Sequence, residues 1–252
     1  MKSENPVSHR IASRSEWLEA REELLLKEKA LTRIRDVVAR KRRELPWVCI
    51  EKPYVFENGH GKETLADLFG TKSQLLIYHF MFGPDWPEGC PSCSYLADHI
   101  DGMLPHLAAH DVSLVVVSRA PFEQIRAFQE RMGWRFKWVS SFGSDFNYDF
   151  HVTSDEAVAP VQYNYRSKAE LEKLGQMYHV KGEQPGLSAF IRQGAEVYHT
   201  YSTYGRGLDL LLGTYNYLDL APKGRDEEGL EFTMAWVRHH DRYGTEPGSC
   251  CK

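Results

Sequence analysis

The sequence predicts an α/β fold in which a central sheet is flanked by helices, with a helical arm at the N-terminus and an extension at the C-terminus. Two apolar runs, residues 74–82 and 112–117, are continuous, as is typical of strands buried on both faces of a parallel sheet. Helix-like segments follow them, over residues 94–110 and 121–132. This alternation of strand and helix indicates an α/β architecture.

The composition is that of a globular protein, since 42% of the 252 residues are apolar and 12% are aromatic. The formal net charge of -4 argues against nucleic acid or an anionic membrane as the main partner. No apolar run approaches the roughly 18 residues that span a bilayer, and the first residues lack the apolar stretch of a signal peptide. We therefore expect a cytoplasmic protein with no membrane partner.

Residues 15–44 predict one long helix or two tandem ones, beginning at a capping box formed by Ser13 and Glu16. Apolar side chains recur there every seven residues, at Trp17, Leu24, Leu31 and Val38. A helix of about thirty residues spans roughly 45 Å, which is longer than a small domain needs. We expect either an arm that packs on another subunit of a homo-oligomer such as a dimer, or a helix folded back on its own core.

The segment 54–69 predicts a short strand, a turn at Asn58-Gly59 and a turn of helix before the first apolar run. Residues 134–150 are rich in aromatic rings and predict a strand followed by a long surface loop, with the rings serving mainly in packing. Residues 187–192 and 197–201, separated by a turn near Gln193-Gly194, predict an antiparallel hairpin.

Three regions follow from this pattern. Residues 1–48 form the N-terminal helical arm, residues 49–204 the α/β domain, and residues 205–252 an extension packed on the domain, with a flexible tail at its end. Within the extension, residues 207–213 predict a helix and residues 232–241 a last apolar helix or strand.

The segment Cys90-Pro91-Ser92-Cys93 follows the first apolar run and opens the next predicted helix. A strand that delivers a C-x-x-C to the first turn of a helix is the layout of a thioredoxin-type redox site. Unpaired N–H groups and the positive end of the helix dipole stabilise a thiolate there, so we expect the pKa of Cys90 to lie below the free-thiol value of about 8.5. We predict that Cys90 attacks a protein or small-molecule disulfide and that Cys93 resolves the mixed disulfide, without a cofactor.

Residues 51–201 resemble the thioredoxin superfamily, in the branch that holds peroxiredoxins and thiol reductases of cytochrome maturation. The resemblance is carried by the lead-in at residues 65–69, the strand into the C-x-x-C, the Val115-Val116-Val117 strand and the late hairpin. Four further segments resemble a bacterial family of uncharacterised thioredoxin-like proteins, known as a domain of unknown function (DUF899). They are Tyr78-His79-Phe80-Met81-Phe82-Gly83-Pro84-Asp85-Trp86, Phe142-Gly143-Ser144-Asp145-Phe146-Asn147-Tyr148-Asp149, Tyr198-His199-Thr200-Tyr201-Ser202 and Trp236-Val237-Arg238-His239-His240-Asp241.

This resemblance implies a thioredoxin-like sheet and a surface that surrounds the cysteines. Thioredoxins dock substrate on a cis-proline just before the late hairpin, where this sequence has Gly186 preceded by Pro185. With Trp86, these residues are the expected substrate surface. The Pro-x-x-x-Thr/Ser-x-x-Cys pattern with which peroxiredoxins bind peroxide is absent, because Glu88 stands four residues after Pro84, and ordinary peroxide reduction is not predicted.

Three histidines are candidates for a second kind of site. His79 interrupts the first apolar run, and either faces the cysteines or is a hydrogen-bonded core histidine. His239 and His240 lie in an Arg-His-His-Asp cluster that either supplies a metal ligand or a proton donor, or forms the solvated end of an element. Two thiolates and an imidazole suit copper or zinc, so the alternative function is a copper- or zinc-binding protein. Its ligands would be Cys90, Cys93 and one of His79, His239 and His240.

The remaining cysteines give weaker signals. Cys49 follows Trp47 and Val48, which predicts a buried structural residue. Cys250 and Cys251 are either part of an unconstrained chain end or an accessible pair that exchanges with the C-x-x-C or passes it a metal. A third hypothesis is an oligomeric interaction module without catalysis, assembled by the helix at residues 15–44.

Overall fold

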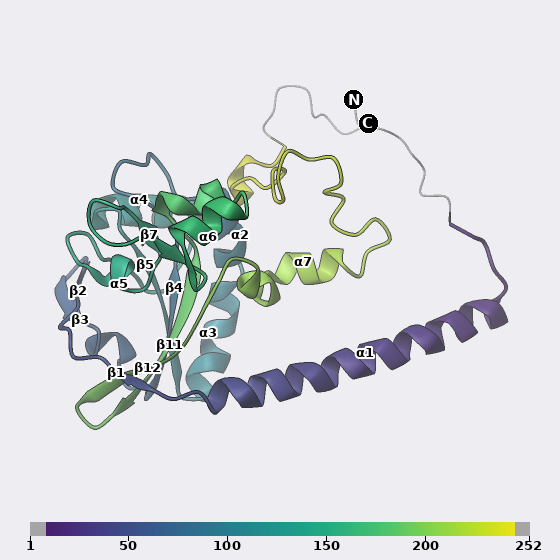
Figure 1. Ribbon diagram of the computed structural model, residues 1–252, viewed down its shortest axis with the longest axis horizontal. Helices are drawn as coiled ribbons and strands as arrows, with labels where there is room; N and C mark the ends of the chain where they lie inside the picture. Colours follow the sequence, from purple (N-terminus) through teal and green to yellow (C-terminus); the bar gives the residue numbers. More distant parts are fainter. Residues whose placement is uncertain (1–8, 245–252) are drawn as a thin grey trace.

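The computed structural model describes residues 9–244, whose centre is a mixed sheet of eight strands in the order β1-β12-β11-β4-β5-β6-β2-β3 (Figure 1). These strands are β1 (Val48–Cys49), β2 (Val55–Asn58), β3 (Gly61–Thr64), β4 (Gln74–His79), β5 (Val112–Ser118), β6 (Trp138–Ser140), β11 (Gly186–Gln193) and β12 (Glu196–Tyr204). Strands β4, β5 and β6 are parallel neighbours, and β11 joins β4 in the antiparallel direction. The predicted α/β fold, with a central sheet flanked by helices, is confirmed.

The crossover from β4 to β5 carries the C-x-x-C. Its predicted single helix is in fact two, α2 (Pro91–Ala97) and α3 (Ile100–Ala109). The break falls at His99, whose ring nitrogen Nδ1 lies 3.0 Å from the carbonyl oxygen of Tyr95. In a continuous helix that carbonyl would accept the N–H of residue 99, which bonds Leu96 instead. The next crossover, α4 (Phe122–Met132), agrees with the prediction.

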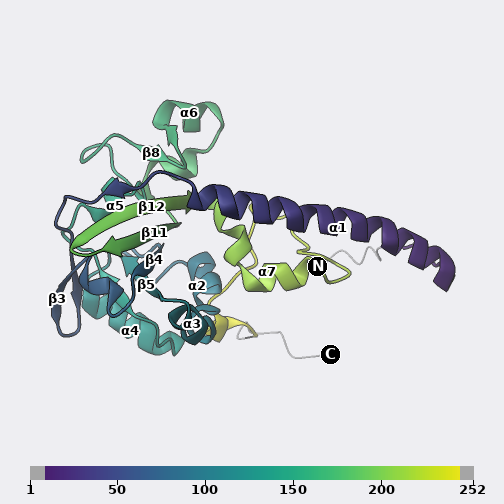
Figure 2. The same cartoon turned by 90° about the horizontal axis from the view of Figure 1, so that it is seen from below.

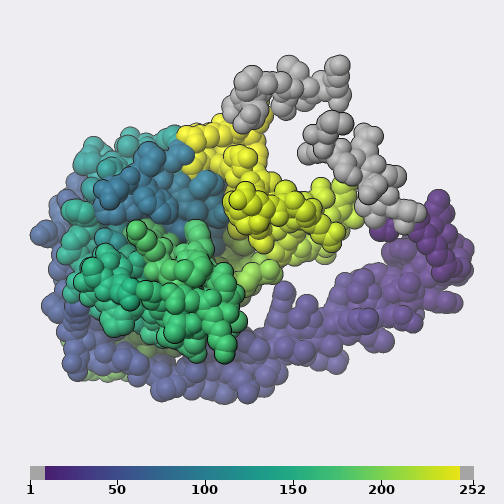
Figure 3. All heavy atoms as spheres, turned by 45° about the horizontal axis from the view of Figure 1, so that its top comes forward, coloured from purple at the N-terminus to yellow at the C-terminus, as the bar shows by residue number. Residues whose placement is uncertain are grey.

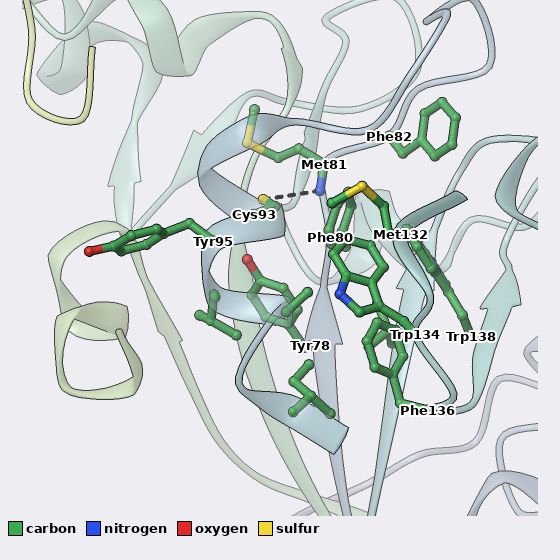
Figure 4. Close-up of a cluster of buried hydrophobic side chains, with 14 of the residues drawn as sticks. Tyr78, Phe80, Met81, Phe82, Cys93, Tyr95, Met132, Trp134, Phe136 and Trp138 are labelled. Carbon is green, nitrogen blue, oxygen red and sulfur yellow. Dashed lines mark hydrogen bonds between the residues drawn. The ribbon is translucent and has the colours of Figure 1, made fainter. Parts of the chain in front are cut away.

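Side chains alternate along the buried strands and form one apolar cluster on each face of the sheet. On β4, Ile77 belongs to one cluster, and Tyr78 belongs to the other together with Cys93. The strand predicted over residues 74–82 ends at His79, and Phe80 follows it into the cysteine face. Cys93 therefore lies within a large aromatic cluster (Figure 4), and Cys90 packs against the same cluster.

Two further predictions about the body need correction. Residues 54–64 form a hairpin of β2 and β3 rather than a single strand. Residues 141–150 are not a surface loop, because α5 (Phe146–Asp149) lies there and Phe146 and Phe150 are buried. The packing role predicted for the aromatic rings of this stretch is confirmed, with Phe142 as an exposed exception.

The predicted late hairpin is confirmed as β11 and β12. The chain between α5 and β11 forms short elements: β7 (Thr153–Ser154), β8 (Gln162–Tyr163), β9 (Arg166–Ser167), α6 (Lys168–Lys173), the 3-10 helix η2 (Met177–Val180) and β10 (Gly182–Glu183). The predicted burial of Cys49 is wrong, since this cysteine is exposed on the two-residue edge strand β1. Among the described strands β1 pairs with β12 alone, so the chain at Cys49 has no strand on its other side.

The N-terminal arm is the single helix α1 (Arg14–Arg43), and its capping box at Ser13 and Glu16 is confirmed. None of its residues is buried, and the helix projects past the sheet in two perpendicular views (Figures 1 and 2). Figure 3 shows that much of its length stands clear of the rest of the described chain. It is therefore not folded back on its own core.

The C-terminal extension returns to the cysteine face of the sheet. It contains the 3-10 helix η3 (Gly205–Leu211) where a helix was predicted over 207–213, then α7 (Gly213–Leu218) and the 3-10 turn η4 (His240–Arg242). Residues 232–239 form turns rather than the predicted apolar helix or strand, yet Val237 reaches the core. Cys250 and Cys251 lie outside the described residues. In the part of the chain that is described, no helix has the length and apolar character needed to cross a membrane.

Candidate active site

The backbone of Met81 fixes both cysteines at the end of the β4 strand. Its carbonyl oxygen accepts the N–H of Cys90 at 3.0 Å, and its own N–H donates to the sulfur of Cys93 at 3.4 Å (Figure 4). Cys90 is the N-cap of α2, and Pro91 follows at the first helical position, as predicted. Cys90 is partly exposed, whereas Cys93 is buried with 2% exposure.

The two thiols differ in acidity because each one acts on the other. A hydrogen bond from the Cys93 side chain, together with the backbone N–H groups of Cys93 and Ser92, lowers the pKa of Cys90 to about 7 despite partial burial. Burial, and the bond it gives to Cys90, raise the pKa of Cys93 well above its ordinary value. This difference favours a thiolate at Cys90 beside a neutral thiol at Cys93. The thiolate is the nucleophilic form of a cysteine, so Cys90 is the more reactive of the two.

Tyr78 lies beneath the pair and was not singled out from the sequence. Its buried hydroxyl points toward the Cys93 sulfur (Figure 4). The hydrogen bond between the two groups lowers the pKa of Cys93, and burial raises the pKa of Tyr78, so the hydroxyl remains a donor. The signal was present, because Tyr78 is one residue before His79 on β4 and strand alternation places it on the opposite face.

Gly89 holds the loop that delivers Cys90 close to the aromatic cluster. A Cβ atom added at this position would lie 2.6 Å from Phe80 and 2.7 Å from Phe128. Those distances are shorter than a carbon contact allows, so only glycine fits here without movement of the loop or of the two rings.

The C-terminal extension is tied to the same loop. His239 is buried, its Nε2 lies 2.8 Å from the carbonyl oxygen of Gly89, and Arg131 of α4 donates to its Nδ1 at 3.3 Å. This pattern makes Nε2 the protonated nitrogen and the donor to Gly89. Glu88 accepts hydrogen bonds from Arg131 at 2.9 Å and from Arg242 at 2.6 and 2.8 Å. Partial burial raises the pKa of the Glu88 carboxyl, but the two arginines outweigh this effect and lower it below its ordinary value.

His79 faces away from the cysteines. Its Nε2 lies 2.8 Å from the hydroxyl of Ser188, and its ring packs on Phe146 and Phe150 in the other cluster. Burial lowers its pKa to about 3, so the ring is neutral. His79 is therefore the hydrogen-bonded core histidine that the sequence allowed, and the alternative that it faces the cysteines is wrong.

The predicted metal ligands are not brought together. Among residues 9–244 no three His, Cys, Asp or Glu side chains form a group that could hold an ion. His239 is engaged with Gly89, and His240 pairs with Asp98 at 2.6 Å on the surface. In the described residues the two cysteines thus have no histidine as a third ligand.

A pocket of about 290 Å³ opens beside Cys90. Trp86, predicted as substrate surface, lines it, and Pro185 and Gly186 do not. Pro185 accepts a hydrogen bond from Tyr163, and the Cα of Gly186 faces Tyr204 and Val152 instead. The further lining residues are Met81, Pro87, Glu88, Gly89, Pro91 and Tyr178. Tyr178 could not be found from the sequence, because it lies 88 residues after Cys90 and only the tertiary fold brings the two together.

Several solved structures are similar to this chain at low identity. A cysteine-to-serine variant of PrxQ from Xylella fastidiosa is 16% identical, with 66% of this chain and 89% of that chain covered and a TM-score of 0.42. The reduced 2-Cys peroxiredoxin of Plasmodium vivax is 15% identical, with 70% and 94% covered and a TM-score of 0.40.

No curated protein matches the sequence significantly. The model of one protein family, described as a bacterial protein of unknown function (DUF899), matches residues 6–243. Because that match takes in almost the whole sequence, this chain belongs to the DUF899 family.

Proposed function

We propose that this protein is a thiol–disulfide oxidoreductase in which Cys90 is the nucleophile and Cys93 the resolving thiol. The observation that carries the proposal is the unequal pair of thiols, with the pKa of Cys90 lowered to about 7 and that of Cys93 raised. Near neutral pH a large fraction of Cys90 is then thiolate, the form that attacks sulfur.

The reaction needs no group beyond the two thiols and a disulfide. The Cys90 thiolate attacks one sulfur of the substrate, forms a mixed disulfide and releases the first thiolate. Cys93 then loses its proton to solvent or to that leaving thiolate and attacks the Cys90 sulfur, which releases the second thiol. The substrate gains two electrons and the protein ends as the Cys90–Cys93 disulfide, which a thiol reductant of a compartment such as the cytoplasm would reopen.

Two groups support the second step. The Tyr78 hydroxyl and the Met81 N–H both donate to the Cys93 sulfur and favour its anion as it forms. Once Cys90 is bound in the mixed disulfide, its negative charge is gone, and the interaction that most directly opposes ionisation of Cys93 disappears with it.

Single-turnover reduction of insulin disulfides tests the proposal. The protein carries Cys49→Ser, Cys250→Ser and Cys251→Ser, so that Cys90 and Cys93 are its only thiols. Cys90→Ser in this background should abolish the reaction, and Cys93→Ser should trap a mixed disulfide visible by mass. Equal reduction by the Cys90→Ser protein would overturn the proposal.

Copper or zinc at the two cysteines is the alternative proposal, and it would need additional ligands from outside the described residues or from another molecule. Metal analysis of protein purified without a chelator tests it. A stoichiometric ion that is lost in Cys90→Ser would support this alternative, and a metal content that does not depend on Cys90 would exclude these ligands.

We also propose that α1 joins two copies of the chain into a homo-oligomer. The four apolar side chains spaced every seven residues along it, Trp17, Leu24, Leu31 and Val38, are between 39% and 51% exposed. Residues seven positions apart lie along one side of a helix and supply one of the two apolar lines with which helices pack in a coiled coil. Mass measurement in solution should show the loss of the oligomer on deletion of residues 1–45, and an unaltered mass would contradict this role.

A further inference from the structure

The pocket beside Cys90 has walls that are mainly apolar. Its lining includes the buried Met81 and, from the loop and a separate segment, Trp86, Pro87, Pro91 and Tyr178. Each lining residue except Tyr178 comes from the chain at 81–91, so the pocket directly adjoins the reactive sulfur. A group held in this pocket would be attached within a few bonds of the atom that Cys90 attacks.

Tyr178 closes the pocket from a separate part of the chain. Its carbonyl oxygen accepts a hydrogen bond from Gln184 at 3.1 Å, and the next residue, His179, stacks on Tyr163 at 4.5 Å. The backbone is thus fixed, while the ring projects outward with 66% exposure. Partial desolvation of the hydroxyl and the negative charge of the nearby Cys90 thiolate raise the pKa of Tyr178 to about 12, so the hydroxyl is neutral at physiological pH.

The charge around the pocket is as informative as its shape. Among the described residues that line it, none is Lys, Arg or His. Apart from the Cys90 thiolate, the one ionic side chain among these described lining residues is Glu88, which already accepts hydrogen bonds from Arg131 and Arg242. A carboxylate on the substrate would find no cation in the lining, and an ammonium group would compete with two arginines for Glu88.

The volume sets the size of the occupant. At about 290 Å³ the pocket is slightly smaller than typical small-molecule sites, which run from roughly 300 to 1,000 Å³. It therefore fits one group the size of an apolar side chain. A large charged disulfide such as oxidised glutathione would leave its carboxylates without partners.

We propose that this pocket selects disulfides that carry an uncharged apolar group next to the scissile sulfur, with Trp86 and Tyr178 as the residues that set this specificity. The inference rests on the proposed function and names its substrate class. The chemistry is unchanged: Cys90 displaces one thiolate, Cys93 displaces the second, and two electrons pass from the dithiol to the substrate.

A series of symmetrical disulfides of Ac-Cys-X-NH2, with X as Phe, Ala, Asp or Lys, varies the neighbouring group while keeping the peptide frame. A second series of short dialkyl disulfides with neutral, carboxylate or ammonium ends removes the peptide. Each rate with the full-length protein that has Cys90 and Cys93 as its only thiols is divided by the rate of the same disulfide with free dithiothreitol. This ratio removes the intrinsic reactivity of each disulfide.

We expect the corrected rate for the Phe peptide to exceed those for the Asp and Lys peptides by about 10-fold. Partial burial of the phenyl ring in the pocket stabilises the transition state by an amount that corresponds to about that factor in rate. Tyr178→Ala and Trp86→Ala should each reduce this preference for the Phe peptide over the Asp and Lys peptides at least threefold. Tyr217→Ala, which removes another exposed tyrosine, should leave it unchanged. The same preference in the dialkyl series would assign recognition to the apolar group itself, and a preference confined to the peptides would assign it to a polypeptide client.

Equal corrected rates across both series would overturn the inference. A preference that survives both Tyr178→Ala and Trp86→Ala would also overturn it, by placing recognition elsewhere. If the protein reduces none of the disulfides, although its Cys90 is alkylated readily, the proposed function fails instead, and the two failures are thus distinguishable.

Discussion

The two extensions of this chain, α1 at one end and residues 205–244 at the other, meet the central domain in opposite ways. No residue of α1 is buried, although its helix is long and well capped. The C-terminal extension has little regular structure, yet four of its side chains, Leu208, Leu212, Tyr215 and Val237, are in the core on the cysteine face. Regular local structure and integration into the fold are therefore separate properties here.

The difference also bears on the site. The C-terminal extension hydrogen-bonds the residue before Cys90 through His239 and pairs with Glu88 through Arg242. In contrast, α1 buries none of its residues, and at its last turn Arg42 lies over the ring of Tyr201 at 5.4 Å. We infer that the C-terminal extension positions the cysteine loop and that α1 leaves it unaffected.

The largest expected effect comes from removing a core side chain of the C-terminal extension. Tyr215 is 1% exposed and packs on Tyr95 and under Arg225. Tyr215→Ala should lower the free energy of unfolding by about 3 to 5 kcal/mol, measured by urea denaturation, because it leaves a cavity. Tyr215→Phe, which loses only the bond to Glu227, should cost about 1 kcal/mol.

Trp17→Ala in α1 is the matched control, because Trp17 is 48% exposed. It should change the free energy of unfolding by no more than about 0.5 kcal/mol at protein concentrations where the chain is monomeric. A cost for Tyr215→Ala as small as this would remove the contrast between the two extensions.

The second prediction concerns His239, which connects the extension to the cysteine loop. His239→Ala leaves the buried carbonyl of Gly89 without its donor and should cost about 2 kcal/mol of stability. The loosened loop should also weaken the hydrogen bonds to the thiolate, so the pKa of Cys90, read from the pH dependence of its alkylation rate, should rise by about half a unit or more. His240→Ala, at the neighbouring exposed position, is the control. If stability falls but the pKa does not move, His239 has a structural role alone.

The third prediction uses pH to measure how strongly the fold favours the Cys90 thiolate. Its pKa is about 7 when folded, against about 8.5 for a free thiol, so in this interval the unfolded chain binds more protons. The reduced protein should therefore gain stability relative to Cys90→Ser as pH rises from about 7 to 8.5, by up to about 2 kcal/mol. The gain is lost as pH falls through 7.

His239→Ala should shrink this pH-dependent difference, and Trp17→Ala should not. Urea denaturation at pH 6, 7 and 8.5 in the presence of a reductant measures it. A difference that is constant with pH would mean that the fold does not favour the thiolate.

Much of this organisation could be predicted from the sequence because its causes are local. The capping box at Ser13, the alternation of strands and helices, and the placement of Cys90 before Pro91 each depend on residues close together in the chain. The same holds for the fold class, since apolar runs of strand length report burial directly. The approach of His239 to Gly89 could not be predicted, because it joins residues 150 positions apart through turns that have no periodic pattern.

The errors have a related cause. Cys49 has apolar neighbours in the sequence, but its burial depends on what covers an edge strand, and among the described residues nothing covers it sufficiently. His79 could be assigned to neither face until the strand's alternation was fixed by its partners, β5 and β11. Tyr178 enters the pocket through tertiary packing of a short 3-10 helix, for which the sequence holds no signal that we recognise.

The smallest expected effect is that of deleting α1 on the cysteine site. Removal of residues 1–45 should leave the pKa of Cys90 unchanged and the single-turnover rate with a dipeptide disulfide within about 1.5-fold of that of the full chain. The reason is that no residue of α1 is buried and none lines the pocket. Loss of the oligomer in the same sample would show that assembly and chemistry are separable. A large fall in rate that dilution of the full-length protein reproduces would instead show that a second copy completes the site, and α1 would then serve the chemistry through the partner rather than through its own domain.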